Sequence, residues 1–405
     1  MSGLGLTFRL TSALRRRSRS VLETGGDGID TVEARVCNVG TEHFLMSPRS
    51  IRGYGPELTS GFPRPFANLG SNERKNSRVA QVPGIMFHHF SSSRYPARPG
   101  ALSDSDLDLL LSRLSKTWNI LPPDDYFEKV RTKSIGVKDT ILTFDDAIKS
   151  QFDVARPVLE GHGLKAAFFI PSSVFSESPD PLQLFANFRE SAFSSFNSFW
   201  RSFLPQAETL YPGTRKALET DFEPGYLREY AFYSLEERRF RYLRDKVLSR
   251  FEYHEIMFSL IDAVPTFDQG SVAANLWMGK SDVVRLLEDG HTIGLHSHTH
   301  PTAMDDLSVE EQTAEYEKNY SSLQKAFGVR SQSVAHPSGK YSWNTLIILR
   351  ELGVQVGFTD SPTNHRFGTN LEIPRVDSAE ALAALDEKMS PLNLQATGKR
   401  RGSEA

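Results

Sequence analysis

The sequence predicts an α/β protein, a distorted (β/α) barrel of about seven parallel strands with a helical insertion. Short apolar runs recur along the chain, and most of them precede a stretch with helical periodicity. The strands expected from these runs lie at 84–88, 140–144, 165–170, 292–295, 333–335, 354–358 and 371–373. Strands that alternate with helices favour a parallel sheet, and seven such units suit a barrel better than a short open sheet.

Three of the expected helices follow these strands directly. The first is expected at 147–160 and the last at 342–352. The helix at 309–327 has the clearest start, because Ser308 and Glu311 have the spacing of a capping box. In that box, each side chain satisfies a backbone N–H group that the first helical turn leaves without a partner.

The periodic region defines one barrel domain over residues 81–387. Residues 1–80 and 388–405 lack sustained periodicity and are expected to be disordered or poorly structured. A segment at about 176–270 interrupts the strand–helix rhythm and is rich in aromatic residues at helical spacings. It is expected to be a helical insertion whose aromatic face packs on the barrel. A platform for sugar rings, or a lid over the site, is the alternative.

Composition excludes several classes of protein. The chain has 405 residues, one cysteine (Cys37) and a formal net charge of −3. One cysteine rules out a scaffold held by intramolecular disulfides. The charge gives no reason to expect nucleic acid or a membrane surface as a partner, and no apolar run is long enough for a transmembrane segment. With no convincing signal peptide, a cytoplasmic location is expected.

Two pairs of polar residues at predicted strand ends carry the chemistry. Asp145 and Asp146 end one apolar run, and His296 and His300 follow another. A catalytic divalent metal takes about three such ligands, and the fourth group is then free to act as a base. One aspartate could instead be a helix N-cap. No glutamate lies between the histidines, so a zincin metalloprotease is not expected.

These residues fall in motifs that resemble those of the polysaccharide deacetylase family, the NodB-homology carbohydrate esterases. Thr143-Phe144-Asp145-Asp146 is similar to its T-F-D-D-G motif, with Ala147 in place of the glycine. His296-Ser297-x-x-His300-Pro301 is similar to its H-[ST]-x-x-H-P motif. Three weaker resemblances accompany them, at Met86–His89, Ala335–Tyr341 and Leu371–Asp377.

The resemblance implies a role for each of the four central residues. Asp146, His296 and His300 would bind a divalent metal, with zinc expected first and cobalt or manganese as alternatives. Asp145 would be the general base. Arg375 is expected to replace the arginine that orients this base in the family.

Other assignments concern substrate and proton transfer. The family's usual general-acid histidine has no clear match, and His336 is the expected replacement. His88 and His89, Ser338 and Tyr341 are expected to contact substrate, with a backbone donor near Ser338 facing the oxyanion.

The function implied is hydrolysis of an N-acetyl group from an N-acetylated sugar or polysaccharide by attack of metal-bound water. Hydrolysis of another linear or cyclic amide is an alternative within the same superfamily. A catalytically silent carbohydrate-binding relative is an alternative from a different class. The N-acetylated carbohydrate is the one partner expected, and the sequence does not predict the oligomeric state.

Overall fold

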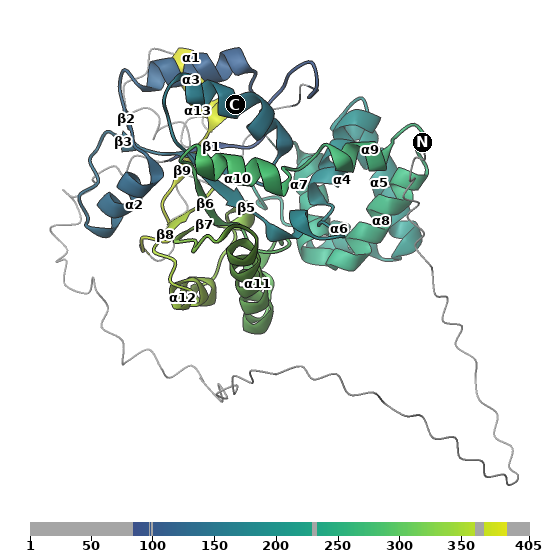
Figure 1. Ribbon diagram of the computed structural model, residues 1–405. Coiled ribbons are helices and arrows are strands. Elements are labelled where there is room, and N and C mark those ends of the chain that lie inside the picture. The colour runs from purple at the N-terminus through teal and green to yellow at the C-terminus, as the bar shows by residue number, and fades with distance from the viewer. Residues whose placement is uncertain (1–83, 97, 99, 229–232, 361–367, 387–405) are drawn as a thin grey trace, which may run out of the picture. The chain divides into compact units, whose positions relative to one another are not determined.

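The computed structural model describes residues 84–386, apart from 97, 99, 229–232 and 361–367. The predictions for 1–80 and 388–405 lie outside these residues. Seven parallel strands form one sheet that is nearly closed into a barrel (Figure 1), in the order β8-β7-β6-β5-β4-β1-β9. The strands are β1 (Gly84–Phe87), β4 (Leu142–Asp145), β5 (Ala167–Ile170), β6 (Thr292–Leu295), β7 (Ser333–Ala335), β8 (Val356–Phe358) and β9 (Arg375–Asp377). The predicted fold class is therefore confirmed.

The segment before β9 brings the two edges of the sheet together. Ile373 forms a parallel bridge with Phe358 at the end of β8, and its N–H donates to the Gly357 carbonyl at 2.8 Å. Two residues later, Arg375 pairs with Gly84 of β1. Pro374 lies between the two pairings, where its carbonyl accepts from the Gly84 N–H at 3.0 Å. The last strand thus begins at Arg375 and not at 371, because the residues before it pair with β8.

The two faces of the sheet bury different clusters. Side chains alternate along each strand, so the outward set packs under the surrounding helices. This larger cluster includes Phe144, Phe168 and Leu295. The inward set forms a smaller cluster that includes Phe169 and Phe358, and the rings of Tyr126 and Phe127 pack against Phe358. Residues on the inner face can therefore meet at the centre of the barrel.

Helices of the barrel cover its outer face, and α2 packs on the inner cluster (Figure 1). They are α1 (Asp104–Leu114), α2 (Pro123–Arg131), α3 (Arg156–Gly161), α10 (Lys280–Glu288), α11 (Val309–Phe327), α12 (Trp343–Glu351) and α13 (Ser378–Asp386). A two-stranded pair, β2 (Asn119–Ile120) and β3 (Asp139–Thr140), flanks α2. The capping box of Ser308 and Glu311 is present at the start of α11. No helix in the described residues is both long and apolar enough to cross a membrane.

The insertion folds into its own group of helices on one side of the barrel (Figure 1). These are α4 (Leu182–Ala192), α5 (Phe196–Leu210), α6 (Thr214–Asp221), α7 (Leu235–Tyr242), α8 (Arg250–Asp262) and α9 (Gln269–Ala274). Four of its aromatic residues, Phe185, Phe188, Phe199 and Phe203, are fully buried in a separate cluster. They form a core for the insertion itself, so they offer no exposed platform for sugar rings.

Candidate functional site

The candidate site lies at the carboxyl ends of three strands. Asp145 ends β4, His88 follows β1 and His296 follows β6. The backbone then turns sharply at Asp146 and His300, where φ is 76° and 54°. Five of the seven non-glycine residues with positive φ in the described chain lie in the site motifs. Such conformations are costly and gather where the surroundings enforce them, commonly at functional sites.

The turn at Asp146 explains how two adjacent aspartates reach one site. Successive residues of a strand point to opposite faces, so a straight strand would separate them. The positive φ of Asp146 and of Ala147 (54°) turns the chain at the strand end. Ala147 adopts the left-handed conformation that glycine adopts without strain.

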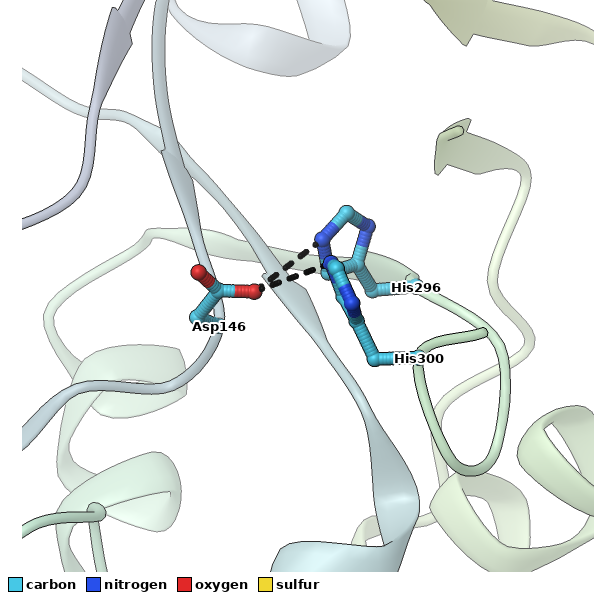
Figure 2. A group of neighbouring side chains, drawn as sticks. All are labelled: Asp146, His296 and His300. Atoms are coloured by element: carbon cyan, nitrogen blue, oxygen red, sulfur yellow. Dashed lines mark ion pairs between the residues drawn. The ribbon is translucent and has the colours of Figure 1, made fainter. Parts of the chain in front are cut away.

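Asp146, His296 and His300 converge on one point (Figure 2). Oδ1 of Asp146 lies 3.3 Å from Nε2 of His296 and 3.3 Å from Nε2 of His300. All three atoms lie within 4.8 Å of one another. Ligands at zinc distances of 2.0–2.1 Å in a tetrahedron stand about 3.3 Å apart. This donor set therefore fits a divalent metal.

The hydrogen bonds of His296 also suit a ligand. Its Nδ1 donates to the Ala335 carbonyl at 2.8 Å, and its Nε2 lies on the side of Asp146. Metal-binding histidines commonly hold their second ring nitrogen in this way. Burial would raise the pKa of Asp146, but the two imidazoles outweigh it and lower that pKa. Burial also lowers the pKa of His300, which favours its neutral, metal-binding form.

Asp145 is held by Arg375 in a buried two-point ion pair. The two guanidinium nitrogens donate to the two carboxylate oxygens at 2.8 and 2.7 Å. The Arg375 side chain is 1% exposed, and its Nε donates to the Thr359 carbonyl. Burial would raise the pKa of Asp145, but the Arg375 charge holds it below its usual value. The predicted partnership of these two residues is present, and Asp145 remains ionised at neutral pH.

The two histidines after β1 face different groups. Nε2 of His88 is 4.0 Å from Oδ2 of Asp145, and this side chain is 32% exposed. His89 turns away, with Nδ1 at 3.5 Å from a guanidinium nitrogen of Arg98. Burial lowers the pKa of His89 to about 3, so its ring is neutral. His88 is therefore the one of the pair that faces the predicted base.

The third predicted motif contributes less directly. His336 is buried, and its Nε2 donates to the Leu371 carbonyl at 2.8 Å. Burial lowers its pKa to about 4. Tyr341 is also buried, stacks on His336 and donates its hydroxyl to Glu372 at 2.9 Å. Ser338 has φ of 51° in the short turn between them. The roles given to these three residues stay predictions, and none of their hydrogen bonds here involves Asp145 or Asp146.

One residue of the insertion joins the site without any sequence signal. Nε2 of Gln183, in α4, donates to Oδ2 of Asp146 at 2.7 Å. This bond occupies the carboxylate oxygen that does not face the histidines. The Oε1 atom of Gln183 is buried and accepts no hydrogen bond within the described residues. Sequence motifs could not identify Gln183, because it lies in a segment with no motif of its own.

Two further side chains hold the histidine loop in place. Asn319 of α11 accepts from the His296 N–H at 3.0 Å and donates to the Ile170 carbonyl at 2.9 Å. Glu315, one turn earlier, accepts from the N–H groups of His298 and Thr299 at 2.8 and 2.7 Å. The helix that begins at the predicted capping box thus fixes the loop that carries the imidazoles of His296 and His300.

Comparison with known proteins agrees with this site. Residues 246–357 match the family model described as polysaccharide deacetylase, a span that includes His296, His300 and His336. None of the curated proteins matches the chain.

Solved structures of deacetylases also match the chain, at low identity. The deacetylase PplD from Streptococcus pyogenes is 16% identical, with a TM-score of 0.45, and the match covers 76% of this chain and 98% of that one. IcaB from Ammonifex degensii is 13% identical, with a TM-score of 0.45 and coverage of 78% and 97%. A de-N-acetylase from Aggregatibacter actinomycetemcomitans is 11% identical, with a TM-score of 0.43 and coverage of 76% and 99%. Residues 246–357 thus match the model of the family that the motifs resemble, and this match supports the predicted enzyme class, a hydrolase of non-peptide amide bonds.

Proposed function

We propose that this protein is a metal-dependent hydrolase that removes N-acetyl groups from an N-acetylated sugar or polysaccharide. One observation carries the proposal: an Asp-His-His group that could hold a divalent metal lies beside a separate, ionised carboxylate. Asp146, His296 and His300 form the group, and Asp145 is the carboxylate held by Arg375. Three ligands leave room in the coordination sphere for water and substrate, as catalytic zinc sites require.

Each residue of the site has a separate role in the proposed reaction. A divalent ion held by Asp146, His296 and His300 would supply Lewis-acid polarisation of the acetyl carbonyl and a water of lowered pKa. Asp145 accepts the proton of the attacking water, and its ionised state at neutral pH makes it available as a base. Arg375 fixes both oxygens of Asp145, so the base keeps one orientation.

The departing amine needs a proton, and His88 is better placed to give it than His336. His88 is partly exposed and lies 4.0 Å from Asp145. His336 is buried and already donates its Nε2 proton to the Leu371 carbonyl. A low pKa of about 4 leaves His336 with that single ring proton at neutral pH. We therefore assign the general-acid role to His88.

The test combines metal analysis with acetate release. We expect the purified protein to bind about one equivalent of zinc, with cobalt and manganese as the ions to compare, and Asp146→Ala to lose it. Asp145→Asn should keep the metal and lose turnover by about 10²–10⁴-fold, the usual contribution of a general base. Asp139→Asn is a matched control, because this buried carboxylate pairs with Lys129 and not with the site.

The outcomes separate the competing functions. Acetate release from a panel of N-acetylated sugars supports the proposal. Bound zinc without acetate release from any of them favours hydrolysis of another amide. A protein that binds no metal would be a silent carbohydrate-binding relative. Undiminished turnover in Asp145→Asn would refute the assignment of the base.

A further inference from the structure

The two imidazoles of the metal group are anchored differently. Nδ1 of His296 donates to the Ala335 carbonyl at 2.8 Å. Nδ1 of His300 is buried and has no hydrogen-bond partner among the described residues. A metal-binding histidine is commonly oriented by a hydrogen bond to its second ring nitrogen. The direction of the His300 ring toward Asp146, visible in Figure 2, therefore depends on the backbone that carries this ring.

That backbone adopts costly conformations at both ends of the short turn after His296. Ser297 has φ of 58° and His300 has φ of 54°. Left-handed conformations of non-glycine residues persist only where surrounding contacts enforce them. Within the turn, the Ser297 hydroxyl accepts from the His300 N–H at 3.0 Å. His298 and Thr299, which lie between these two residues, are bonded from outside the turn.

Thr299, the residue before His300, is held from both sides. On the barrel side, Glu315 accepts from its N–H at 2.7 Å and also from its hydroxyl. On the side of the insertion, the Arg250 guanidinium donates to its hydroxyl oxygen at 2.6 Å and to its carbonyl at 3.0 Å. A hydroxyl can donate one hydrogen bond and accept another, as it does here. Two helices, α11 and α8, thus hold the same residue of the turn.

Asp180 orients the Arg250 guanidinium. The two side chains form an ion pair, in which the aspartate is 8% exposed and the arginine 44%. The other oxygen of Asp180 accepts from the Leu182 N–H at 3.0 Å, where α4 begins. Leu182 precedes Gln183, whose amide contacts Asp146. The ion pair therefore joins the start of α4 to α8 next to two contacts with the metal group.

The position of Arg250 is unfavourable for its own helix. Arg250 is the first residue of α8, directly after the N-cap Ser249. A cation at a helix N-terminus opposes the helix macrodipole. Ser249 and Glu252 complete the capping box of this helix without Arg250. Helix stability therefore does not account for an arginine at this position, whereas its contacts with Thr299 and Asp180 do.

We propose that Arg250 is a positioning residue for the metal group. Its guanidinium, oriented by Asp180, holds the hydroxyl and carbonyl of Thr299. This contact fixes the left-handed turn that directs the His300 ring toward Asp146. The inference rests on the proposed function, in which His300 binds the metal. It gives the insertion a role in holding the histidine loop, in addition to the bond from α4 to Asp146.

The first test compares zinc affinity, measured by competition with a chelator. Arg250→Met removes both bonds to Thr299 and should weaken zinc binding about tenfold, the lower end of the effect of residues that orient metal ligands. Arg250→Lys keeps a donor and the charge that pairs with Asp180, so it should recover part of this loss. Arg238→Met is the matched control, because Arg238 lies on α7 of the same insertion and donates to the Pro224 carbonyl at 2.6 Å. It should bind zinc as the wild type does.

Acetate release at two zinc concentrations distinguishes positioning from a role in the chemical step. At limiting zinc, Arg250→Met should release acetate more slowly than the wild type. At zinc that saturates the variant, its kcat should return to that of the wild type, because Arg250 bonds to Thr299 and Asp180 and not to a metal ligand. A kcat that stays low at saturating zinc would overturn the inference.

A double-mutant cycle tests whether the effect passes through Thr299. Thr299→Val removes the hydroxyl that bonds to both Arg250 and Glu315. The double variant should lose less zinc affinity than the two single variants predict together, because both changes break the same contact. Additive losses would mean that Arg250 acts by another route, and they would contradict the inference.

The outcomes keep this inference apart from the proposed function. If Arg250→Met binds zinc more weakly than Arg238→Met but the wild type releases no acetate, the positioning role stands and the deacetylase proposal fails. Equal zinc affinities of these two variants overturn the positioning role alone. A wild type that binds no zinc overturns both.

Discussion

Asp145 and Asp146 show how adjacent identical residues acquire different chemistry. Asp146 faces two imidazoles and the Gln183 amide, whereas Asp145 faces the guanidinium of Arg375. Both are buried, and the charges around each lower its pKa despite burial. The difference lies in geometry, since Arg375 takes both oxygens of Asp145 while Asp146 presents one oxygen to the histidines.

Sequence reasoning predicted this core of the site and little of its surroundings. The four central residues lie in two specific motifs, and Arg375 stands in the expected final-strand motif. Gln183 gave no signal, because its role depends on how α4 packs against the barrel. The preference for His88 over His336 likewise needed the burial and hydrogen bonds of both rings.

Removing the charge of Arg375 should shift the pH dependence of the enzyme. In Arg375→Met, Asp145 loses the charge that does most to lower its pKa, so burial raises that pKa relative to the wild type and the acidic limb of kcat/KM moves to higher pH. A buried carboxylate without its partner costs about 3–5 kcal/mol of stability at neutral pH. In the wild type, the stability from this pair is present above the ordinary carboxylate pKa and is lost as pH falls through the lowered one. The stability difference between variant and wild type should therefore narrow in acid.

Arg156→Met is the control for this pH shift. It breaks another Arg–Asp pair, to Asp289, in which both side chains are mostly buried. It should change stability and leave the acidic limb of kcat/KM in place. If Arg375→Met leaves the acidic limb of kcat/KM at the same pH, titration of Asp145 does not produce that limb.

The general acid can be identified from the leaving group that each variant tolerates. His88→Gln should lower the hydrolysis of N-acetyl sugars by about 10²–10⁴-fold, because an amine cannot leave without a proton. It should largely keep the hydrolysis of 4-nitrophenyl acetate, whose leaving group departs as an anion. His336→Gln should show no such selectivity. A selective loss in His336→Gln instead would restore the assignment expected from the sequence.

At the scale of elements, the strands were predictable and their ends were not. Strands of a parallel sheet are buried on both faces and have nearly continuous apolar runs, so six of the seven were expected close to their observed positions. The seventh begins later because the residues before Pro374 bridge to β8. The helix expected at 147–160 begins later too, as a π-helical turn at Gln151–Ala155, because Asp146 and Ala147 adopt left-handed conformations. The first deviation lies where the chain closes the barrel, and the second lies where the chain forms the site.

The insertion illustrates a second limit of sequence patterns. Its aromatic spacing correctly indicated helices, but the same spacing fits packing on the barrel, a sugar platform or an internal core. The structure places these rings in a core of their own. The one residue of α4 shown to contact the site is polar, Gln183, and a single polar residue on a helix is a pattern that any solvent-exposed helix can have.

For the whole molecule, the bond between Gln183 and Asp146 should couple metal binding to the stability of the insertion. A ligand that binds only the folded form protects the segments whose opening would break its site. Saturating zinc should therefore slow hydrogen exchange at 142–148 and 292–300, and also at 182–192 in α4. In Gln183→Ala, zinc should no longer slow hydrogen exchange in α4, but it should still slow exchange at 142–148 and 292–300. This variant should also bind zinc about 10–100-fold more weakly.

Gln206→Ala is the matched variant for this experiment, because it removes an amide of the same insertion that bonds to Ser259 and not to the site. It should keep zinc protection in all three segments. If α4 is protected equally in both variants, zinc stabilises the insertion by another route, and the Gln183 bond does not couple it to the barrel. If α4 shows no zinc protection even in the wild type, the insertion opens independently of the metal group.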